Sequence, residues 1–208
     1  DEPQHVLTGR ITLALLKLFK IKTIIIKSEK NFKQITRLLK YAKKYKRPVA
    51  CVVEPGIFTK LKKISVKQNK KLIDRAEAIE HILRFSKKNT KIISTIGYAS
   101  REILQIKKEK KIKNGKLFLM VGGMGHASAT STGVNMSGKN EVICIDGDGA
   151  FLMHMGNVVT SVAYAKQNYK YILFDNNAHE STGVQPTISN KINFKKIASA
   201  FGFKKIYN

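Results

Sequence analysis

The sequence has few cysteines, few acidic residues and no long apolar run. Its 208 residues include 2 Cys and 14 Asp and Glu, against 39 Lys and Arg. Two cysteines are too few for a disulfide framework, so we expect Cys51 and Cys144 to be small buried residues of a protein from the reducing cytoplasm. No stretch of about 18 apolar residues occurs, which argues against a membrane span.

The shortage of acidic residues leaves a formal net charge of +25 that is unevenly distributed. Residues 141–208 contain seven Lys and five acidic residues, a balance of +2, so residues 1–140 carry the remaining +23. Runs such as KLKKISVKQNKK (60–71) contain no interleaved aromatic residues, and no zinc-finger or RNA-recognition signature accompanies them. We interpret them as solvated surface and expect no specific nucleic-acid partner; the alternative is a non-catalytic, basic nucleic-acid-binding module.

Apolar β-rich runs alternate with runs of helical periodicity, which predicts an α/β fold with a parallel sheet covered on both faces. A basic, weakly periodic linker over 56–72 divides the chain into residues 1–55 and 73–208. In the first part we expect strands at 22–26 and 48–54 and a helix at 31–45. In the second we expect strands at 91–95, 116–121, 141–146 and 169–175, the start of another after 202, and helices at 74–88, 100–108, 125–135, 150–166 and 194–202.

The chain does not begin with Met, shows no secretory signal, and starts and stops within what read as structural elements. We therefore expect a fragment whose larger domain is truncated at its C-terminus.

Glycines or amides follow four successive predicted strands. They are Gly97, Gly122 and Gly123, Gly147 and Gly149, and Asn176 and Asn177. The carboxyl ends of parallel strands meet at one edge of a sheet, which is where ligands bind in such folds. The sequence therefore predicts a ligand site at this edge.

The run ICIDGDGAFLMHMGN (143–157) places acids among these glycines. Gly147 and Gly149 allow a sharp turn and close approach of a ligand, and the next helix directs its N–H groups there, which suits a phosphate. Asp148 would repel that phosphate unless a cation lies between them, and Mg²⁺ commonly bridges carboxylates and phosphate oxygens. We expect Mg²⁺ bound by Asp148 and Asn176; the alternative for Asp148 alone is a helix cap.

These motifs resemble those of thiamine diphosphate-dependent enzymes. The resemblance runs over nearly the whole chain, and within that family it is closest to the phosphonopyruvate and sulfopyruvate decarboxylases. It rests on DEPQH (1–5), STIGYASREI (94–103), VGGMGHASATSTGV (121–134), GDGAFLMHMG (147–156) and NNAHESTGVQPT (176–187). It implies thiamine diphosphate and Mg²⁺ as cofactors and the decarboxylation of a 2-oxo acid. The implied reaction converts phosphonopyruvate to phosphonoacetaldehyde and CO₂, with sulfopyruvate as the alternative substrate.

The resemblance also implies roles for individual residues. Alignment on GVQPT makes Asp148 and Asn176 the side-chain ligands of Mg²⁺ and Ala178 the carbonyl ligand, whereas the literal NN pair would give Asn177. Met124 corresponds to the bulky residue that holds the cofactor bent, with core packing as the alternative. The cofactor is further expected to contact Gly97, Tyr98, Ala99, Gly123, Gly125, Gly147, Gly149 and Ala150.

The substrate would be a small anion that needs donor groups near the strand ends. His126 and His179 are the expected catalytic histidines, because histidine can donate a proton near neutral pH. Ser181 and Gln185 are further donors, and His154 is expected to be a packed residue of a helix.

One feature of the family has no counterpart in this chain. The family's activating glutamate comes from a pyrimidine-binding domain and lies upstream of the region that DEPQH matches; Glu54 reads as an ordinary acid at a strand end. We expect residues 1–55 to be the C-terminal part of such a domain and the chain alone to be inactive. Because the family forms its sites between subunits, we expect a homo-oligomer; a split enzyme with a separate partner is the alternative.

Overall fold

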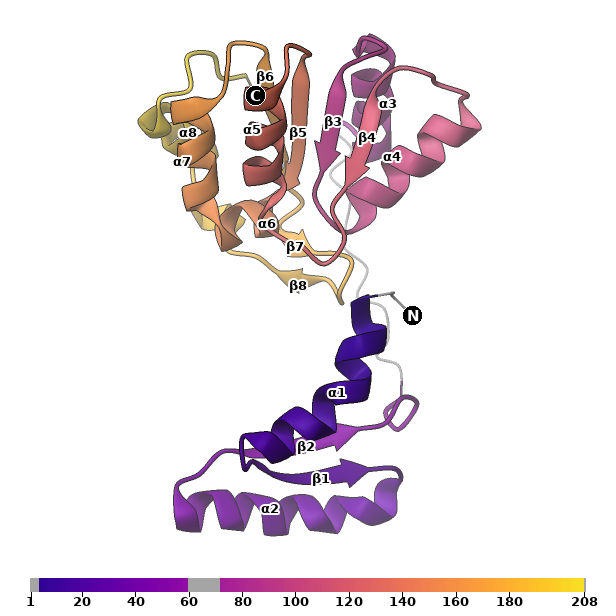
Figure 1. Ribbon diagram of the computed structural model, residues 1–208, viewed down its shortest axis with the longest axis vertical. Helices are drawn as coiled ribbons and strands as arrows, with labels where there is room; N and C mark the ends of the chain where they lie inside the picture. The colour runs from indigo at the N-terminus through magenta and orange to yellow at the C-terminus, as the bar shows by residue number, and fades with distance from the viewer. Residues whose placement is uncertain (1–3, 60–71, 208) are drawn as a thin grey trace. The chain divides into compact units, whose positions relative to one another are not determined.

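The chain divides into two compact units, Asp1–Ser65 (unit 1) and Val66–Asn208 (unit 2). The computed structural model describes residues 4–59 and 72–207 (Figure 1). The division falls within the linker expected over 56–72, of which residues 60–71 lie outside the described ranges. The strands of both units pair in parallel except for one short hairpin, so the predicted α/β class with a parallel sheet is confirmed.

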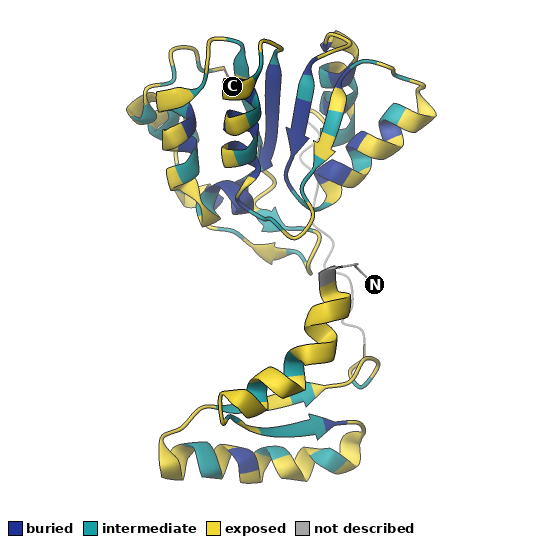
Figure 2. Cartoon of the chain, in the orientation of Figure 1, coloured by how far each residue is buried: buried dark blue, intermediate teal, exposed yellow. Residues whose placement is uncertain are grey.

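Unit 1 is a small layer of helices on a two-stranded sheet. It contains α1 (Gln4–Leu18), β1 (Lys22–Ile26), η1 (Glu29–Asn31), α2 (Phe32–Tyr45) and β2 (Val49–Val53). The strands β1 and β2 pair in parallel, with Lys22 opposite Val49. Among the apolar residues described in this unit, only Ile26 and Leu38 are buried. Most of its described residues are exposed or half-buried (Figure 2).

Two features of unit 1 differ from the prediction. Helix α1 was not expected, because its apolar and polar residues are not segregated onto opposite faces. Cys51 was expected to be buried but is exposed. Its neighbour on the same face of β2, Val53, is exposed as well, so the unit leaves this face of the strand uncovered.

Unit 2 contains a four-stranded parallel sheet of order β4-β3-β5-β6. Its strands are β3 (Lys91–Ser94), β4 (Lys116–Leu119), β5 (Val142–Gly147) and β6 (Tyr169–Phe174). The helices are α3 (Arg75–Phe85), α4 (Tyr98–Glu109), α5 (Ala127–Ser137), α6 (Asp148–Met153), α7 (Met155–Tyr164) and α8 (Phe194–Phe201). A two-residue antiparallel hairpin, β7 (Ala178–His179) and β8 (Gln185–Pro186), and the turn η2 (Ser189–Lys191) follow β6.

Local signals explain the helix boundaries of unit 2. The Asp74 carboxylate accepts a hydrogen bond from the Ala76 N–H at 2.8 Å and so caps the N-terminus of α3. The helix expected over 150–166 is instead two helices, because His154 has φ −138° and ψ 49°. His154 is exposed rather than packed. After α8 the described chain forms no strand up to residue 207, so the strand expected there is wrong.

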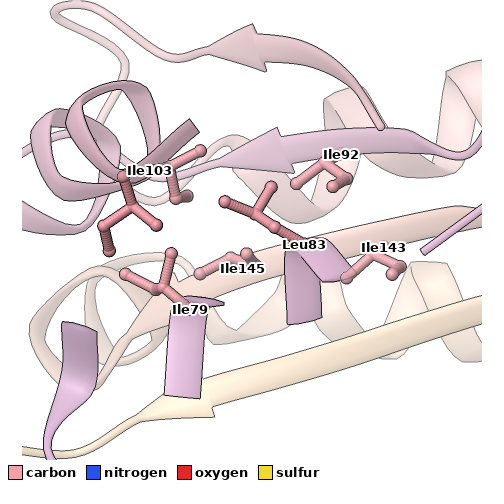
Figure 3. Packing of buried hydrophobic residues seen from close by; sticks show 7 residues of the cluster. Ile79, Leu83, Ile92, Ile103, Ile143 and Ile145 are labelled. Carbon is pink, nitrogen blue, oxygen red and sulfur yellow. The ribbon is translucent and has the colours of Figure 1, made fainter. Parts of the chain in front are cut away.

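The core of unit 2 has two layers, one on each face of the sheet. Neighbouring strand residues such as Ile92 and Ile93 point to opposite faces, as the pleat requires. On one face, α3 and α4 pack against the sheet through Ile79, Leu83, Ile92, Ile103, Ile106, Ile143 and Ile145 (Figure 3). On the other face, α5 packs against the sheet through Ile93, Ala127, Val142 and Cys144. Burying one Ile or Leu side chain contributes about 1.5–3 kcal/mol, so these layers are the main source of the unit's stability.

The strand order creates a crevice at one edge of this sheet. From β3 the chain passes through α4 to β4 on one side, whereas the next strand, β5, lies on the other side of β3. The connecting helices α4 and α5 therefore cover opposite faces. Such a reversal leaves a crevice at the carboxyl ends of the two central strands, and ligands bind there in open parallel sheets.

No helix within residues 4–59 and 72–207 is both long and apolar enough to cross a membrane.

Candidate functional site

A pocket of about 100 Å³ opens at the carboxyl ends of β3, β5 and β6. It therefore lies where the strand order predicts a crevice. The predicted site residues that line it are Gly97, Tyr98, Ala99, Met124, Gly147, Asp148, Gly149, Ala150, Asn176, Ala178, His179 and Ser181. Those that do not line it are Gly123, Gly125, His126, Asn177 and Gln185. The assignment of all of these residues to a cofactor or a reaction stays a prediction.

Asp148 is a buried carboxylate in the lining of the pocket, with 3% of its surface exposed. It is the first residue of α6, Gly147 occupies the N-cap position, and no side chain caps this helix end. The helix-cap interpretation of Asp148 therefore does not describe this structure. Instead, the Thr187 hydroxyl donates a hydrogen bond to Asp148 Oδ2, which fixes the carboxylate against the segment after β8.

The two successive asparagines after β6 point in different directions. Asn176 lines the pocket; its Nδ2 donates to Glu180 Oε2 at 3.1 Å, and its Oδ1 accepts from the Ala178 N–H at 3.2 Å. Asn177 has φ +58°, and its Oδ1 accepts from the Ser189 hydroxyl at 2.9 Å. Of the two amides, only that of Asn176 is available to a ligand in the pocket.

Two glycines are required by the geometry of the pocket. Gly97 has φ +104°, which side chains of L-residues rarely permit, and it immediately precedes α4. At Gly149 a Cβ atom would lie 2.4 Å from Cε1 of His179, so only glycine lets this ring pack against α6. Both residues were predicted because they follow strands.

The two candidate catalytic histidines lie in different surroundings. His179 is half-buried on β7, and its ring faces Gly149 within the pocket. His126 is exposed before α5, its Nδ1 lies 3.0 Å from the Met124 carbonyl oxygen, and its ring centroid is 4.4 Å from that of His154. The structure therefore places only His179 beside the other candidate residues.

A second carboxylate, that of Asp146, also lines the pocket and is 1% exposed. Its oxygens accept hydrogen bonds from the Tyr171 hydroxyl at 2.8 Å and from the Gly147 N–H at 3.0 Å. Burial raises the pKa of Asp146, and these two hydrogen bonds partly oppose that rise.

Arg75 is the cation of the pocket, and it is already paired with acids. It forms ion pairs with Glu102 at 2.7 Å and with Glu180 at 2.6 Å. The hydrogen bond with Glu102 is the largest cause that raises the pKa of Arg75, so the guanidinium stays charged. The lining thus carries the carboxylates of Asp146, Asp148 and Glu180 against one neutralised guanidinium.

These residues fit a diphosphate that binds through a divalent cation. The three carboxylates of the lining would repel a bare diphosphate, whereas a cation between them and the anion would be attracted to both. The Thr95 hydroxyl is buried in the lining beside Asp146, where it would also donate a hydrogen bond to a phosphate oxygen.

The oxygen donors suit Mg²⁺ rather than a metal held by protein alone. Within the described part of the chain, no cluster of three or more His, Cys, Asp or Glu could hold a metal ion. Mg²⁺ commonly binds one or two carboxylates and completes its coordination with phosphate oxygens and waters. Asp148, the Asn176 amide and the Ala178 carbonyl would provide such a partial set.

Several residues of the site were missed from the sequence. Arg75, Glu102 and Glu180 belong to three segments that are far apart in the chain, and an isolated sequence gives no signal that they meet. The contact of Thr187 with Asp148 spans 39 residues and was equally hidden. The available signal was that Glu102 falls within the motif STIGYASREI, and Glu180 and Thr187 within NNAHESTGVQPT.

The chain that carries this pocket matches a known protein family. The family described as "Thiamine pyrophosphate enzyme, C-terminal TPP binding domain" matches residues 95–208. Phosphonopyruvate decarboxylase of Streptomyces viridochromogenes is 32% identical over 133 residues, which cover 64% of this chain and 32% of that protein. Sulfopyruvate decarboxylase subunit beta of Methanothermobacter thermautotrophicus is 33% identical over 135 residues, or 65% of this chain and 70% of that subunit.

The chain thus spans about a third of the length of the phosphonopyruvate decarboxylase and most of the sulfopyruvate decarboxylase subunit. A solved thiamin diphosphate-dependent enzyme of Mycobacterium smegmatis matches with a TM-score of 0.47 and 15% identity, over 61% of this chain and 25% of that one. That likeness is too weak to carry an argument. The sequence match over more than half of its residues shows that the chain belongs to the thiamine pyrophosphate enzymes, as the C-terminal cofactor-binding domain of that family.

Proposed function

We propose that unit 2 binds the diphosphate of thiamine diphosphate through Mg²⁺, with Asp148, Asn176 and the Ala178 carbonyl as protein ligands of the ion. The observation that carries this proposal is that the buried Asp148 carboxylate and the Asn176 amide line the same pocket. A carboxylate at that place disfavours an anion unless a cation joins them. Membership of the thiamine pyrophosphate enzymes supports thiamine diphosphate as the anion.

The phosphate oxygens would be bound by backbone N–H groups. Helices α4 and α6 both begin at the pocket, after Gly97 and Gly147, and neither start has a side-chain cap. The N–H groups of their first turns have no partner within the helix, which favours an anion at this position. The Thr95 hydroxyl would add one donor, and Met124 would support the cofactor rings.

The proposed reaction is the decarboxylation of a 2-oxo acid. The bound cofactor would supply an electron sink for the electrons of the broken carbon–carboxylate bond. His179 lies in the pocket and would hold or donate a proton at the substrate, because a ring nitrogen of histidine can donate or accept a proton. Ser181 would donate a hydrogen bond to the anionic end of the substrate. His126 lies outside the pocket, so this proposal gives it no role.

We propose phosphonopyruvate as the substrate, with phosphonoacetaldehyde and CO₂ as products. The resemblance of the motifs and the relative named phosphonopyruvate decarboxylase support this choice. Sulfopyruvate is the second candidate, supported by the relative named sulfopyruvate decarboxylase subunit beta, of which this chain covers 70%. Both substrates are small anions, and the donors of the pocket do not distinguish a phosphonate from a sulfonate.

The substrate can be tested by CO₂ release from the native protein, isolated together with any subunits that accompany it. With Mg²⁺ and thiamine diphosphate present, we expect a higher kcat/KM for phosphonopyruvate than for sulfopyruvate, and no release without the cofactor. A preference for sulfopyruvate would reassign the substrate. Release that persists at the same rate without thiamine diphosphate would contradict the proposed reaction itself.

We further propose that the protein is cytoplasmic.

We also propose that its complete site includes a second subunit. The family forms its sites between subunits, which supports a homo-oligomer in which unit 1 belongs to the pyrimidine-binding side. The alternative is a split enzyme, supported by relatives whose names denote a beta subunit. Size measurement of the native protein, followed by identification of its chains, distinguishes one kind of subunit from two.

A further inference from the structure

Arg75 connects three segments of unit 2 at the edge of the pocket. Its Nε and Nη2 atoms donate to the two carboxylate oxygens of Glu102 on α4, both at 2.7 Å. Its Nη1 atom donates to Glu180 Oε2, just after β7, at 2.6 Å. The Arg75 side chain is only 22% exposed. A two-pronged contact of this kind fixes both the position and the plane of the guanidinium.

The Glu180 carboxylate passes this constraint on to Asn176. The same oxygen that binds Arg75, Glu180 Oε2, also accepts a hydrogen bond from Asn176 Nδ2 at 3.1 Å. An ionised carboxylate only accepts hydrogen bonds, so the end of the amide that faces it must be the NH₂ group. The carbonyl oxygen, Oδ1, is thereby directed to the other side of the amide, where it meets the Ala178 N–H.

The orientation of this amide decides whether Asn176 can bind a cation. With Nδ2 on Glu180, the amide presents its oxygen, which is a ligand for Mg²⁺. Rotated by half a turn, it would present two N–H donors, which repel a cation. We propose that Arg75 is a positioning residue for the metal site: it holds Glu180, and Glu180 holds Asn176 in the orientation that binds Mg²⁺. This inference rests on the proposed function.

A role of Arg75 as a direct anion-binding residue fits the structure less well. Its donors already face two carboxylates, so its charge is neutralised within the protein.

Arg75 holds one end of the segment that contains β7 and β8, through its ion pair with Glu180. The other end is held by the hydrogen bond between Thr187 and Asp148. The two contacts together fix the segment that carries Asn176 and Ala178.

The test is the Mg²⁺ concentration at which thiamine diphosphate binding is half-maximal, measured by calorimetry on the protein in its native assembly. For Arg75→Gln we expect this concentration to rise about tenfold, the scale typical of residues that orient metal ligands. Arg84→Gln is the matched control. Arg84 lies on the same helix and forms an ion pair with Glu80 at 2.6 Å, and neither of these two residues lines the pocket. We expect it to change the Mg²⁺ requirement less than about twofold.

Two further variants separate orientation from general stability. Glu180→Ala removes the acceptor for Asn176, whereas Glu180→Gln retains an oxygen that can accept from both Asn176 and Arg75. We expect Glu180→Ala to raise the Mg²⁺ requirement as Arg75→Gln does, and Glu180→Gln to restore most of the loss. Melting temperatures without cofactor are measured for every variant, and the Glu180 pair decides the matter if Arg75→Gln does not fold.

The outcomes distinguish this inference from the proposed function. If the unaltered protein binds no thiamine diphosphate at any Mg²⁺ concentration, the proposed function and the inference are both wrong. If it binds, but Arg75→Gln and Arg84→Gln have equal Mg²⁺ requirements, only the inference is wrong. A Glu180→Gln variant as weak as Glu180→Ala would show that the charge matters rather than the orientation, which also overturns it.

Discussion

Units 1 and 2 have the same alternation of strands and helices, yet they differ in how much apolar surface they bury. Of the apolar residues that the structure describes, two are buried in unit 1, Ile26 and Leu38, and fifteen in unit 2. Among the described residues, unit 1 has a two-stranded sheet, whereas unit 2 has a four-stranded sheet with helices on both faces. A two-stranded sheet is at best marginally stable in water, so only unit 2 has a core sufficient to hold a site in place.

The two units also differ in their carboxylates. Glu54 in unit 1 is an exposed acid that pairs with Lys27 at 3.3 Å, and its side chain is 47% exposed. Asp148 in unit 2 is almost fully buried in the lining of a pocket. Because acids are buried only when something compensates their charge, the burial of Asp148 supports the proposed binding of a cation, a role that we do not propose for Glu54.

The largest expected effect sets these two acids against each other. Asp148→Asn removes the charge that we propose binds Mg²⁺, and we expect the Kd for thiamine diphosphate at fixed Mg²⁺ to rise at least about a hundredfold. Glu54→Gln removes an exposed ion pair and should change that Kd less than about twofold. Calorimetry measures both values. Equal losses for the two variants would show that the site is not confined to unit 2.

The next effect compares one leucine from a helix of each unit. Leu83 on α3 is fully buried, and Leu39 on α2 is 60% exposed. We expect Leu83→Ala to lower the free energy of unfolding by about 2–5 kcal/mol, because it leaves a cavity in the core. Leu39→Ala should change it by less than about 0.5 kcal/mol. Urea denaturation followed by circular dichroism tests this, and a large loss for Leu39→Ala would indicate a hidden partner for α2.

Hydrogen exchange compares the sheets themselves. β5 is hydrogen-bonded to strands on both sides, whereas β1 pairs with β2 alone among the strands that the structure describes. We expect the amides of β1 to exchange at least about a hundredfold faster than those of β5, because local opening of a small unit costs less free energy. Mass spectrometry of peptic fragments reports both rates. Equal protection would mean that another subunit or segment covers unit 1 in solution.

The smallest effect concerns one cysteine in each unit. Cys51 is exposed, whereas Cys144 is buried under α5, where burial raises the pKa of its thiol to about 12. The thiolate is the reactive form, so at pH 8 we expect one thiol of the native chain to react with a thiol reagent and two to react after denaturation. Two reactive thiols in the native protein would contradict the dense packing of unit 2.

The same contrast shows what the sequence could predict. The four strands of the parallel sheet of unit 2 were predicted to within about two residues, because continuous apolar runs bounded by glycine identify buried parallel strands. The short strands β7 and β8 were not predicted. Gly97, Asp148 and Asn176 were placed at one edge for the same reason. Cys51 was wrongly expected to be buried, because an apolar strand pattern does not show whether another element covers each face of the strand.

Other features depend on contacts that no local pattern reports. The break at His154 lies where the Asn157 side chain binds the Gly125 carbonyl at 3.0 Å, a contact across 32 residues. The pair of Arg75 and Glu180 spans 105 residues. The preference for Asn176 over Asn177 came from a motif alignment, whereas the directions of their side chains depend on Glu180 and Ser189.

The central claim is that a divalent cation joins the Asp148 carboxylate to the diphosphate of the cofactor. Its most direct test is to titrate thiamine diphosphate into the native protein by calorimetry, once with Mg²⁺ and once with a chelator of divalent cations. We predict saturable binding with Mg²⁺ and none with the chelator. Binding of equal affinity under both conditions would contradict the account.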